Sequence, residues 1–580
     1  MTLPRKNRLL AFVLYLALTL SFSAPLTRAQ RQTAPPKRPR LVLLIVVDQF
    51  RYDYLERFGD LFGPNGFQRL LRDGASWAQA NYDHMPTYTA PGHGTMMTGA
   101  WPAESGIIAN EWIDRPTGRR ITSVTDDAVK TLGSDANEPA ASPRRLLSST
   151  VGDELRLFTN DRSKVIGVSV KDRSAILPAG RHANAAYWFS TVSGNMVSST
   201  YYFNQLPAWV TTFNNSRPAD KYFGAKWERL VAEDEYVRRA GPDSPPWETV
   251  PSNSGDTNAF PHTITGGATS AGRAFYGALD YSPFSNDLLV SFAEQAITNE
   301  QLGQDDDPDV LTVSFSANDY VGHRYGPYSQ EAMDATLRVD RQIATLLDFV
   351  AARVGLNNAL IAFTADHGVA PIPEQAAALG LGGARINAND VLGAVHSALT
   401  ARYNPQGKTP DPSADYILKY NNYGAPAEAF LNGNIYFNYD ALKRDHVPLD
   451  EVSQVVATAA LTVPGIARSF TRAQLLRGAT SITDPIERRV LHGFFPVRSG
   501  DVVILAEPYK YLGETITATH GSPYTYDTHV PLIIMGAGVT PGRYLEAATP
   551  ADIAPTLSAL LHITAPSNAV GRVLIEAIRK

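Results

Sequence analysis

The chain has 580 residues, of which 44% are hydrophobic and 19% charged, as expected of a soluble globular protein with roughly one to three domains. Its formal net charge of -5 excludes the strongly basic surface that bulk nucleic-acid binding requires, so no nucleic-acid partner is expected. The sequence contains no cysteine, which excludes disulfides, cysteine-ligated zinc, iron–sulfur sites and a cysteine nucleophile.

The N-terminus has the pattern of a secretory signal peptide. Basic residues precede an apolar run over residues 9 to about 22, and small residues flank a cleavage point after Ala29. We therefore predict a signal peptide over residues 1–29, a periplasmic or secreted location, and membrane contact only through this export signal. An uncleaved anchor is the alternative, although the run is short for a bilayer span. The Pro- and Arg-rich residues 30–40 are predicted to form a flexible lead-in.

Short runs of apolar and β-branched residues then end abruptly in polar residues. Near-continuous hydrophobic strands separated by helix-capable segments are typical of a parallel sheet that is buried on both faces. The predicted fold class is therefore α/β, with a central, mostly parallel sheet flanked by helices. The runs occupy residues 41–50, 163–173, 309–319 and 358–368, followed by 501–509, 529–538 and a helical segment over 551–563.

Two long polar tracts rich in Gly, Asn and Tyr interrupt this pattern, at about residues 185–298 and 373–500. Connections within compact domains are usually far shorter. We therefore predict that these tracts are inserted cap regions within one domain spanning residues 41–580, and not separate domains.

Acidic residues follow three of the predicted strands, where an open α/β sheet binds its ligands. Asp366 and His367 are adjacent at one strand exit and can reach one cation together, because Gly368 permits the backbone to turn. The alternative is a helix cap beside a surface histidine. Asp48 follows another strand, where an acidic residue is unremarkable in most proteins.

Asp319 and His323 stand four residues apart, which places them on one face of a helical turn as a metal clip. The alternative is an ordinary hydrogen-bonded pair on a helix. Lys171 and Arg173 are alternate residues, so they project to the same side if the preceding strand continues. Two cations at this edge suit a dianionic phosphate, although both residues are equally compatible with an ordinary charged surface.

Thr89 lies just before the Ala-Pro-Gly-His sequence, where a helix is expected to begin. Pro91 suits a first helical turn, and Thr89 is placed to cap that helix, which is the commoner role for such a residue. Together with the acidic strand ends, the histidines and the cationic pair, however, Thr89 gives the set of residue types that metal-assisted phosphoryl transfer uses, with Thr89 as the hydroxyl nucleophile.

A set of motifs follows in chain order: "VVDQF", "PTYTAPGHGTMMTG", "PAESGIIAN", "KDR", "SANDYVGH", "TADHG" and "THGSPYTYDTHVPLIIMG". In this order they resemble the alkaline phosphatase superfamily, and within it the PafA-like bacterial phosphate monoesterases with a threonine nucleophile. The resemblance runs from about residue 41 to the C-terminus. It implies an alkaline-phosphatase-like sheet with inserted caps, and a site with two Zn²⁺ ions.

The resemblance also implies a role for each residue at the metal site. One zinc ion would be held by Asp48, Thr89, Asp366 and His367, and the other by Asp319, His323 and His520. We prefer His520 to His529 as the last ligand, because a small-residue turn follows it, as in the family.

Thr89 would be the nucleophile that forms a covalent phosphothreonine, and Asn110 would donate its amide to a phosphate oxygen. Lys171 and Arg173 match the pair that marks the monoesterase branch. Three further histidines near the motifs, His84, His93 and His182, are predicted to be structural or to support neighbouring ligands.

The resulting prediction is an exported, metal-dependent alkaline phosphatase, a hydrolase that acts on small phosphate monoesters. One alternative is a nucleotide phosphodiesterase or phosphonate hydrolase on the same scaffold. Another is a non-catalytic envelope protein that binds phosphate or metal. A sulfatase is disfavoured, because its formylglycine needs Cys or Ser where Thr89 stands.

Overall fold

The computed structural model describes residues 38–135, 137–248, 257–422, 425–478, 483–513 and 517–579. The predicted signal peptide and most of the predicted lead-in lie outside these residues. Residues 39–580 form one unit, which holds every helix and strand named below. Among the described helices, none combines the length and apolar content that a bilayer crossing requires.

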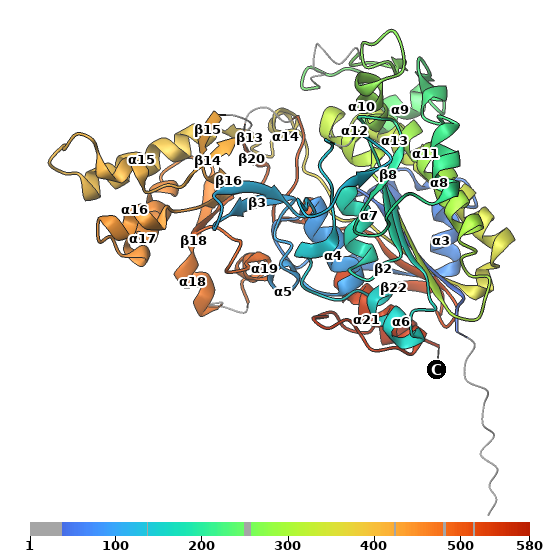
Figure 1. Ribbon diagram of the computed structural model, residues 1–580. Helices are drawn as coiled ribbons and strands as arrows, with labels where there is room; N and C mark the ends of the chain where they lie inside the picture. The colour runs from blue at the N-terminus through green and yellow to red at the C-terminus, as the bar shows by residue number, and fades with distance from the viewer. Residues whose placement is uncertain are drawn as a thin grey trace, which may run out of the picture. The chain divides into compact units, whose positions relative to one another are not determined.

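A ten-stranded sheet forms the centre of this unit (Figure 1). Its middle strands run parallel in the order β12-β1-β11-β6-β7, so the predicted mostly parallel sheet is confirmed. These strands span Ala359–Thr364 (β12), Leu41–Val47 (β1), Asp309–Phe315 (β11), Val165–Ser169 (β6) and Ala185–Phe189 (β7).

Antiparallel pairings occur only toward the two edges of the described sheet. The predicted strand near the C-terminus is β21, and it runs antiparallel to β12 and β2. At the other edge β8 runs antiparallel to β7 and β5. The edge strands span Leu532–Gly536 (β21), Gly74–Ala80 (β2), Gly542–Ala548 (β22), Met196–Ser199 (β8) and Thr131–Leu132 (β5).

Strand β1 shows why the sheet is buried on both faces. All its residues are buried, and alternate side chains enter two different hydrophobic clusters. Leu43 and Ile45 pack in the larger cluster, which α11 (Phe284–Asn299) and α13 (Gln330–Arg353) help to form. Leu44 and Val46 pack in the other, with α4 (Thr89–Thr98) and α21 (Ile553–Leu561). The period-two alternation of a strand therefore divides one apolar run between two cores.

A second sheet forms from the later polar tract together with the strand that follows it, and it has its own core. The predicted strand over residues 501–509 is β19, and it belongs here and not to the central sheet. The order is β16-β17-β19-β18, with bounds Phe430–Leu431 (β16), Asn434–Ile435 (β17), Val502–Ala506 (β19) and Ile466–Thr471 (β18). Helices α15 (Ala388–Tyr403) and α17 (Leu449–Ala460) supply much of the cluster that covers it.

The earlier tract is organised differently. It begins with β7 and β8 of the central sheet, and its helices include α8 (Ala208–Asn215), α10 (Arg273–Asp280) and α11. Their buried side chains, such as Phe275 and Leu289, join the larger cluster of the central sheet. This tract therefore extends the main core, whereas the later one builds a core of its own.

Helix α19 (Pro485–Gly493) packs against the segment that precedes α4 and so links the second sheet to it. Arg488 donates two hydrogen bonds of 2.8 Å to the carboxylate of Asp83, and the backbone N–H of Met85 donates to Arg489 O at 2.9 Å. A Cβ on Gly493 would lie only 1.5 Å from Met85 O, so only glycine permits this approach. The side chain of Met85 shares one cluster with residues of α19 and β19.

Candidate active site

The three predicted acidic residues meet at the carboxyl end of the central sheet. Asp48 directly follows β1, Asp366 follows β12, and Asp319 lies in α12 (Ala317–Tyr325) just after β11. Because β1 pairs in parallel with both β11 and β12, the ends of these strands are neighbours. All three carboxylates are buried, so they form an acidic cluster that is shielded from solvent.

These acids and three histidines form two groups with the spacing of metal ligands. In each group the candidate ligand atoms lie within 4.8 Å of one another. In the first, His367 Nε2 is 3.4 Å from Asp48 Oδ1 and 3.3 Å from Asp366 Oδ2. In the second, Asp319 Oδ1 is 3.2 Å from His323 Nε2 and 3.7 Å from His520 Nε2.

The two groups adjoin. The rings of His367 and His520 stack with centroids 3.5 Å apart and planes inclined by 13°. On another side, Lys171 Nζ lies 2.6 Å from Asp48 Oδ2 and 2.5 Å from Asp319 Oδ2, so one ammonium group bridges an acid of each group. The structure therefore brings both predicted ligand groups and a predicted catalytic lysine into a single site.

Each of the three histidines is oriented by a backbone carbonyl. Nδ1 lies 2.6 Å from Ala518 O in His323, 2.9 Å from Gly368 O in His367 and 2.7 Å from Thr87 O in His520. A carbonyl oxygen only accepts hydrogen bonds, so Nδ1 carries the proton and donates it. The lone pair of Nε2 is then left to face the carboxylates, as in histidines that bind metal ions.

Besides the spacing of the candidate ligands, the buried carboxylate oxygens also suit divalent cations. Asp48 Oδ1 is buried and has no hydrogen-bond partner, an arrangement that is costly for a carboxylate oxygen unless a cation satisfies it. Asp366 Oδ2 is equally buried, and His93 Nδ1 lies 3.2 Å from it. A set of carboxylate oxygens and imidazole nitrogens suits zinc and similar metal ions.

The electrostatics of the cluster follow from burial and crowding. Burial, together with the charges of Asp319 and Asp366, raises the pKa of Asp48 well above its usual value. Burial and the neighbouring His367 and His323 hold the pKa of His520 well below the usual value. A neutral imidazole at physiological pH is the form that binds a cation.

Thr89 is the first residue of α4, and Tyr88 occupies the N-cap position. Thr89 is therefore not the cap residue, and its Oγ1 lies 3.5 Å from His367 Nε2. The helix reaches the acids closely, because a Cβ on Gly92 would lie 2.2 Å from Asp366 O. The positive end of the helix dipole and its free N–H groups favour negative charge at this point.

Asn110 lies beside the start of the same helix. Its Oδ1 accepts a hydrogen bond of 2.8 Å from Ala90 N–H. This bond fixes which end of the amide is the oxygen, so the NH₂ end is left as a donor. The structure thus brings Asn110 next to Thr89.

The strand-based placement of Lys171 and Arg173 was wrong. Strand β6 ends at Ser169, Lys171 is the N-cap residue of α7 (Asp172–Ala179), and Arg173 lies in its first turn. Lys171 nevertheless reaches both acids as described. Burial would lower the pKa of Arg173, but the charges of Asp172 and of the acidic cluster raise it, and its buried Nε has no hydrogen-bond partner.

The geometry favours His520 over His529 as the last candidate metal ligand. His520 belongs to the second ligand group, whereas His529 stacks on Tyr52 at 4.3 Å and its Nε2 lies 3.0 Å from Ala78 O. His93 supports the start of α4: its Nδ1 lies 2.9 Å from Thr89 O and its Nε2 2.8 Å from Ser314 Oγ.

Sequence reasoning assigned no role to Gln49, which connects the two ligand groups. Its backbone N–H donates to Asp366 Oδ1 at 3.0 Å, and its side-chain amide donates to Asp319 Oδ1 at 2.7 Å. The residue adopts a left-handed backbone with φ 63°, which is costly for a side chain other than glycine and is often found at functional sites. Its position next to Asp48 was the one available signal.

We expect Gln49→Leu to lower the affinity for zinc by roughly 10- to 100-fold, the usual effect of removing a partner that orients metal ligands. Titration of the metal-free protein with zinc against a chromophoric chelator measures this directly. The exposed Gln454 on α17 provides the control Gln454→Leu. Unchanged zinc affinity in Gln49→Leu would show that the amide does not organise the site.

Comparison with known proteins agrees with this geometry. The type I phosphodiesterase / nucleotide pyrophosphatase family matches residues 42–526. The chain is 36% identical to alkaline phosphatase PhoV of Synechococcus elongatus over 93% of each chain. It is 35% identical to alkaline phosphatase PafA of Elizabethkingia meningoseptica over 95% of this chain and 96% of PafA. A crystal structure of wild-type PafA matches with a TM-score of 0.85 and 34% identity, and covers 93% of this chain and 99% of PafA.

Proposed function

We propose that this chain, which belongs to the type I phosphodiesterase / nucleotide pyrophosphatase family and is an enzyme of the alkaline phosphatase type, hydrolyses small phosphate monoesters through a covalent phosphothreonine. The observation that carries the proposal is the position of Lys171, a buried cation between the two ligand groups. With Arg173 nearby, it gives the site two positive charges beyond any metal ions. A monoester dianion gains more from these charges than a diester monoanion does.

Two zinc ions are the cofactors we propose. Asp48, Asp366 and His367 would hold one with Thr89, and the second group of acid and histidines described above would hold the other. When bound, the ions would neutralise charge on the phosphoryl oxygens and lower the pKa of hydroxyl groups at the site.

In the first step Thr89 Oγ1 attacks phosphorus in line. The new oxygen–phosphorus bond forms as the bond to the alcohol oxygen breaks. Thr89 gives up its proton to solvent, and the alcohol oxygen takes one up from solvent. Asn110 donates to a phosphoryl oxygen through its NH₂ group, while Lys171 and Arg173 hold the remaining negative charge. Phosphoryl transfer depends mainly on such positioning and charge stabilisation.

In the second step water attacks the phosphothreonine from the side that the alcohol left. The threonine oxygen–phosphorus bond breaks, Thr89 regains a proton, and inorganic phosphate is released. Two successive in-line displacements retain configuration at phosphorus. The α4 N-terminus stabilises the negative charge that develops on Thr89 in both steps.

The diesterase alternative has one specific observation in its favour, which is the family match itself. The cationic pair weighs against it, for the charge reason given above. A non-catalytic binding protein is disfavoured because the hydroxyl of Thr89 lies beside a complete set of candidate ligands. We also propose export through the predicted signal peptide, with a periplasmic or secreted location.

The proposal is tested by comparing kcat/KM for an aryl phosphate monoester and for its methyl diester, with purified zinc-loaded protein at alkaline pH. We expect a strong monoester preference, loss of both activities on chelation, and recovery with zinc. A diester preference would place the protein among the diesterases. Stoichiometric phosphate binding without turnover of either substrate would favour the non-catalytic alternative.

A further inference from the structure

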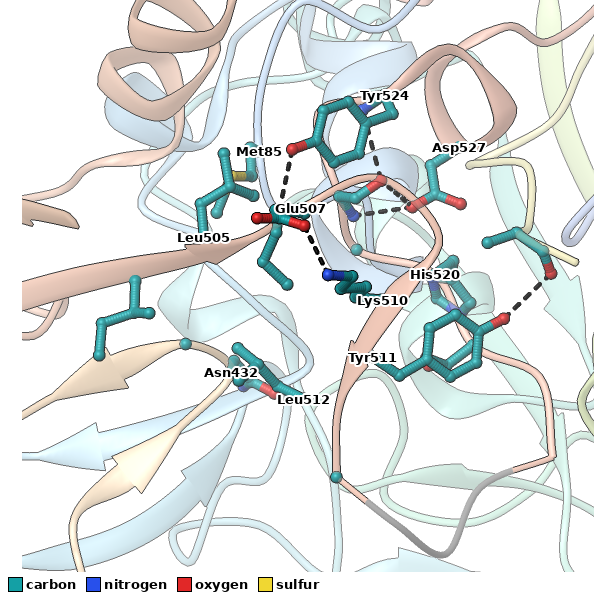
Figure 2. A pocket seen from close by; sticks show the side chains of 18 of the residues that line it. Met85, Asn432, Leu505, Glu507, Lys510, Tyr511, Leu512, His520, Tyr524 and Asp527 are labelled. Atoms are coloured by element: carbon teal, nitrogen blue, oxygen red, sulfur yellow. Dashed lines mark hydrogen bonds and ion pairs between the residues drawn. The ribbon is translucent and has the colours of Figure 1, made fainter. Parts of the chain in front are cut away.

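A cavity of about 290 Å³ lies beside the site (Figure 2). One wall comes from the segment before α4 and from the loop that carries His520, and includes Met85, Tyr88 and Tyr524. The other comes from the second sheet and β20 (Lys510–Leu512), and includes Asn432 and Leu512. The cavity therefore forms between the second sheet and the segments that flank the candidate active site.

The cavity touches the candidate active site at two residues. Tyr88 immediately precedes Thr89, and His520 belongs to the second ligand group. Their rings pack edge to face with centroids 5.5 Å apart. Among the described residues that line the cavity, His520 is the one candidate ligand. The cavity thus adjoins the second group directly, through His520.

In an in-line displacement the attacking and leaving oxygens lie on opposite sides of phosphorus, and this determines which part of a substrate would point into the cavity. Thr89 Oγ1 lies next to His367 of the first group, so the leaving oxygen, opposite the nucleophile, points toward the second group. An alcohol attached to that oxygen would extend past His520. The cavity is therefore positioned to receive the alcohol part of a phosphate monoester.

The walls favour an aromatic alcohol. Three lining tyrosines have their hydroxyl groups engaged by backbone atoms: Tyr524 donates to Ala506 O at 2.9 Å, Tyr511 to Pro371 O at 2.9 Å, and Tyr526 accepts from Tyr509 N–H at 3.1 Å. They consequently present carbon rings to the cavity, beside apolar residues such as Leu505 and Leu512. Aromatic rings pack well against such surfaces.

The volume of the cavity and the charges on its lining further restrict the class of alcohol that it can accept. The volume is at the low end of the range for ligand pockets, which suits one ring better than a nucleoside. The one lysine on the lining, Lys510, forms an ion pair of 2.6 Å with Glu507, which also lines the cavity (Figure 2). These two charges compensate each other. Asp527 also lines the cavity, and its Oδ2 accepts hydrogen bonds from Ser522 N–H and Oγ at 2.7 and 2.6 Å, so the described lining disfavours an anionic alcohol.

We propose that this cavity is the subsite for the alcohol part of the substrate and that it selects phosphate monoesters of single-ring aromatic alcohols. The proposal rests on the phosphatase function proposed above. Selection arises from apolar contact with the ring, and the reaction itself is unchanged.

Two substitutions of Leu512 test the proposal, because one should fill the cavity and the other should enlarge it. Leu512→Trp should fill the cavity and lower the ratio of kcat/KM for phenyl phosphate to that for methyl phosphate on the order of tenfold, as for the loss of a good apolar fit. Leu512→Ala should enlarge the cavity and raise the ratio of naphthyl to phenyl phosphate several-fold. The control is Leu476→Trp, at an exposed leucine of α18 (Arg472–Arg477), which should leave both ratios unchanged.

Because the test measures ratios of kcat/KM between substrates, failure of the subsite proposal can be distinguished from failure of the proposed phosphatase function. If the wild-type protein hydrolyses neither methyl nor phenyl phosphate, both proposals fail. If it hydrolyses both but neither ratio changes in the Leu512 variants, the subsite proposal alone is overturned. If Leu512→Trp is too damaged to assay, the naphthyl ratio of Leu512→Ala decides, and an unchanged value rejects the subsite.

Discussion

Thr89→Ala is expected to reduce kcat/KM for an aryl phosphate monoester on the order of a thousandfold or more, because it removes the atom that forms the new bond to phosphorus. Zinc content should remain near that of the wild type, since the acids and histidines of both ligand groups are retained. Turnover and bound zinc are measured on the same preparation. Acid quenching with labelled substrate should trap phosphate on the wild-type chain and not on the variant.

A matched control lies in the same helix. Thr95 is buried in α4, and its hydroxyl donates to Pro91 O at 2.9 Å, so Thr95→Ala removes a helix-bound hydroxyl of the same type away from the ligands. Thr95→Ala should retain turnover and phosphate trapping. Loss of zinc together with activity in Thr89→Ala would make Thr89 chiefly a structural ligand, and retained turnover would exclude it as the nucleophile.

The second large effect is expected from the double variant Lys171→Ala/Arg173→Ala. It should lower kcat/KM for the monoester roughly 100-fold more than for the methyl diester, because each charge-assisted contact to a dianion contributes on the order of tenfold. The measured quantity is the change in the monoester-to-diester ratio. Loss of Lys171 also leaves Asp48 and Asp319 without their shared partner, so zinc content must be determined in parallel.

The other end of the same strand supplies a control pair. Lys164 and Arg162 lie just before β6 and interact there with Glu300 O and Asp307, so Lys164→Ala/Arg162→Ala removes the same charges far from the ligands. This control should leave the monoester-to-diester ratio unchanged. Equal losses on monoester and diester in the Lys171/Arg173 variant would contradict the proposed basis of selectivity.

The sheet and the meeting of its acidic strand ends could be predicted because both depend on local pattern. An apolar run such as residues 41–47, buried on both faces, has few alternatives to a central parallel strand. The acids that end such runs must then meet at one edge. The placement of Asp48, Asp319 and Asp366 at one edge follows in this way. Their grouping with the histidines, and the preference for His520 over His529, followed instead from the resemblance to the alkaline phosphatase superfamily.

The rest depends on contacts that no local pattern encodes. The left-handed backbone of Gln49 and its two hydrogen bonds appear only when three strand ends are assembled. Lys171 reaches the acids from a helix start because β6 is shorter than its apolar run indicated. Strand β19 has the sequence of a central strand, but it pairs with partners in the later tract. The cavity lining also comes from segments far apart in the chain.

The docking of α19 limits how this enzyme can be recombined with its relatives. The segment that leads into Thr89 is held by Arg488, Arg489 and Gly493, some 400 positions later in the chain. A chimera that exchanged the second sheet and α19 alone would pair a foreign helix with the native Asp83 and Met85. Exchanges at this boundary therefore need to transfer the segment before α4 and α19 as one inherited unit, although they are distant in sequence.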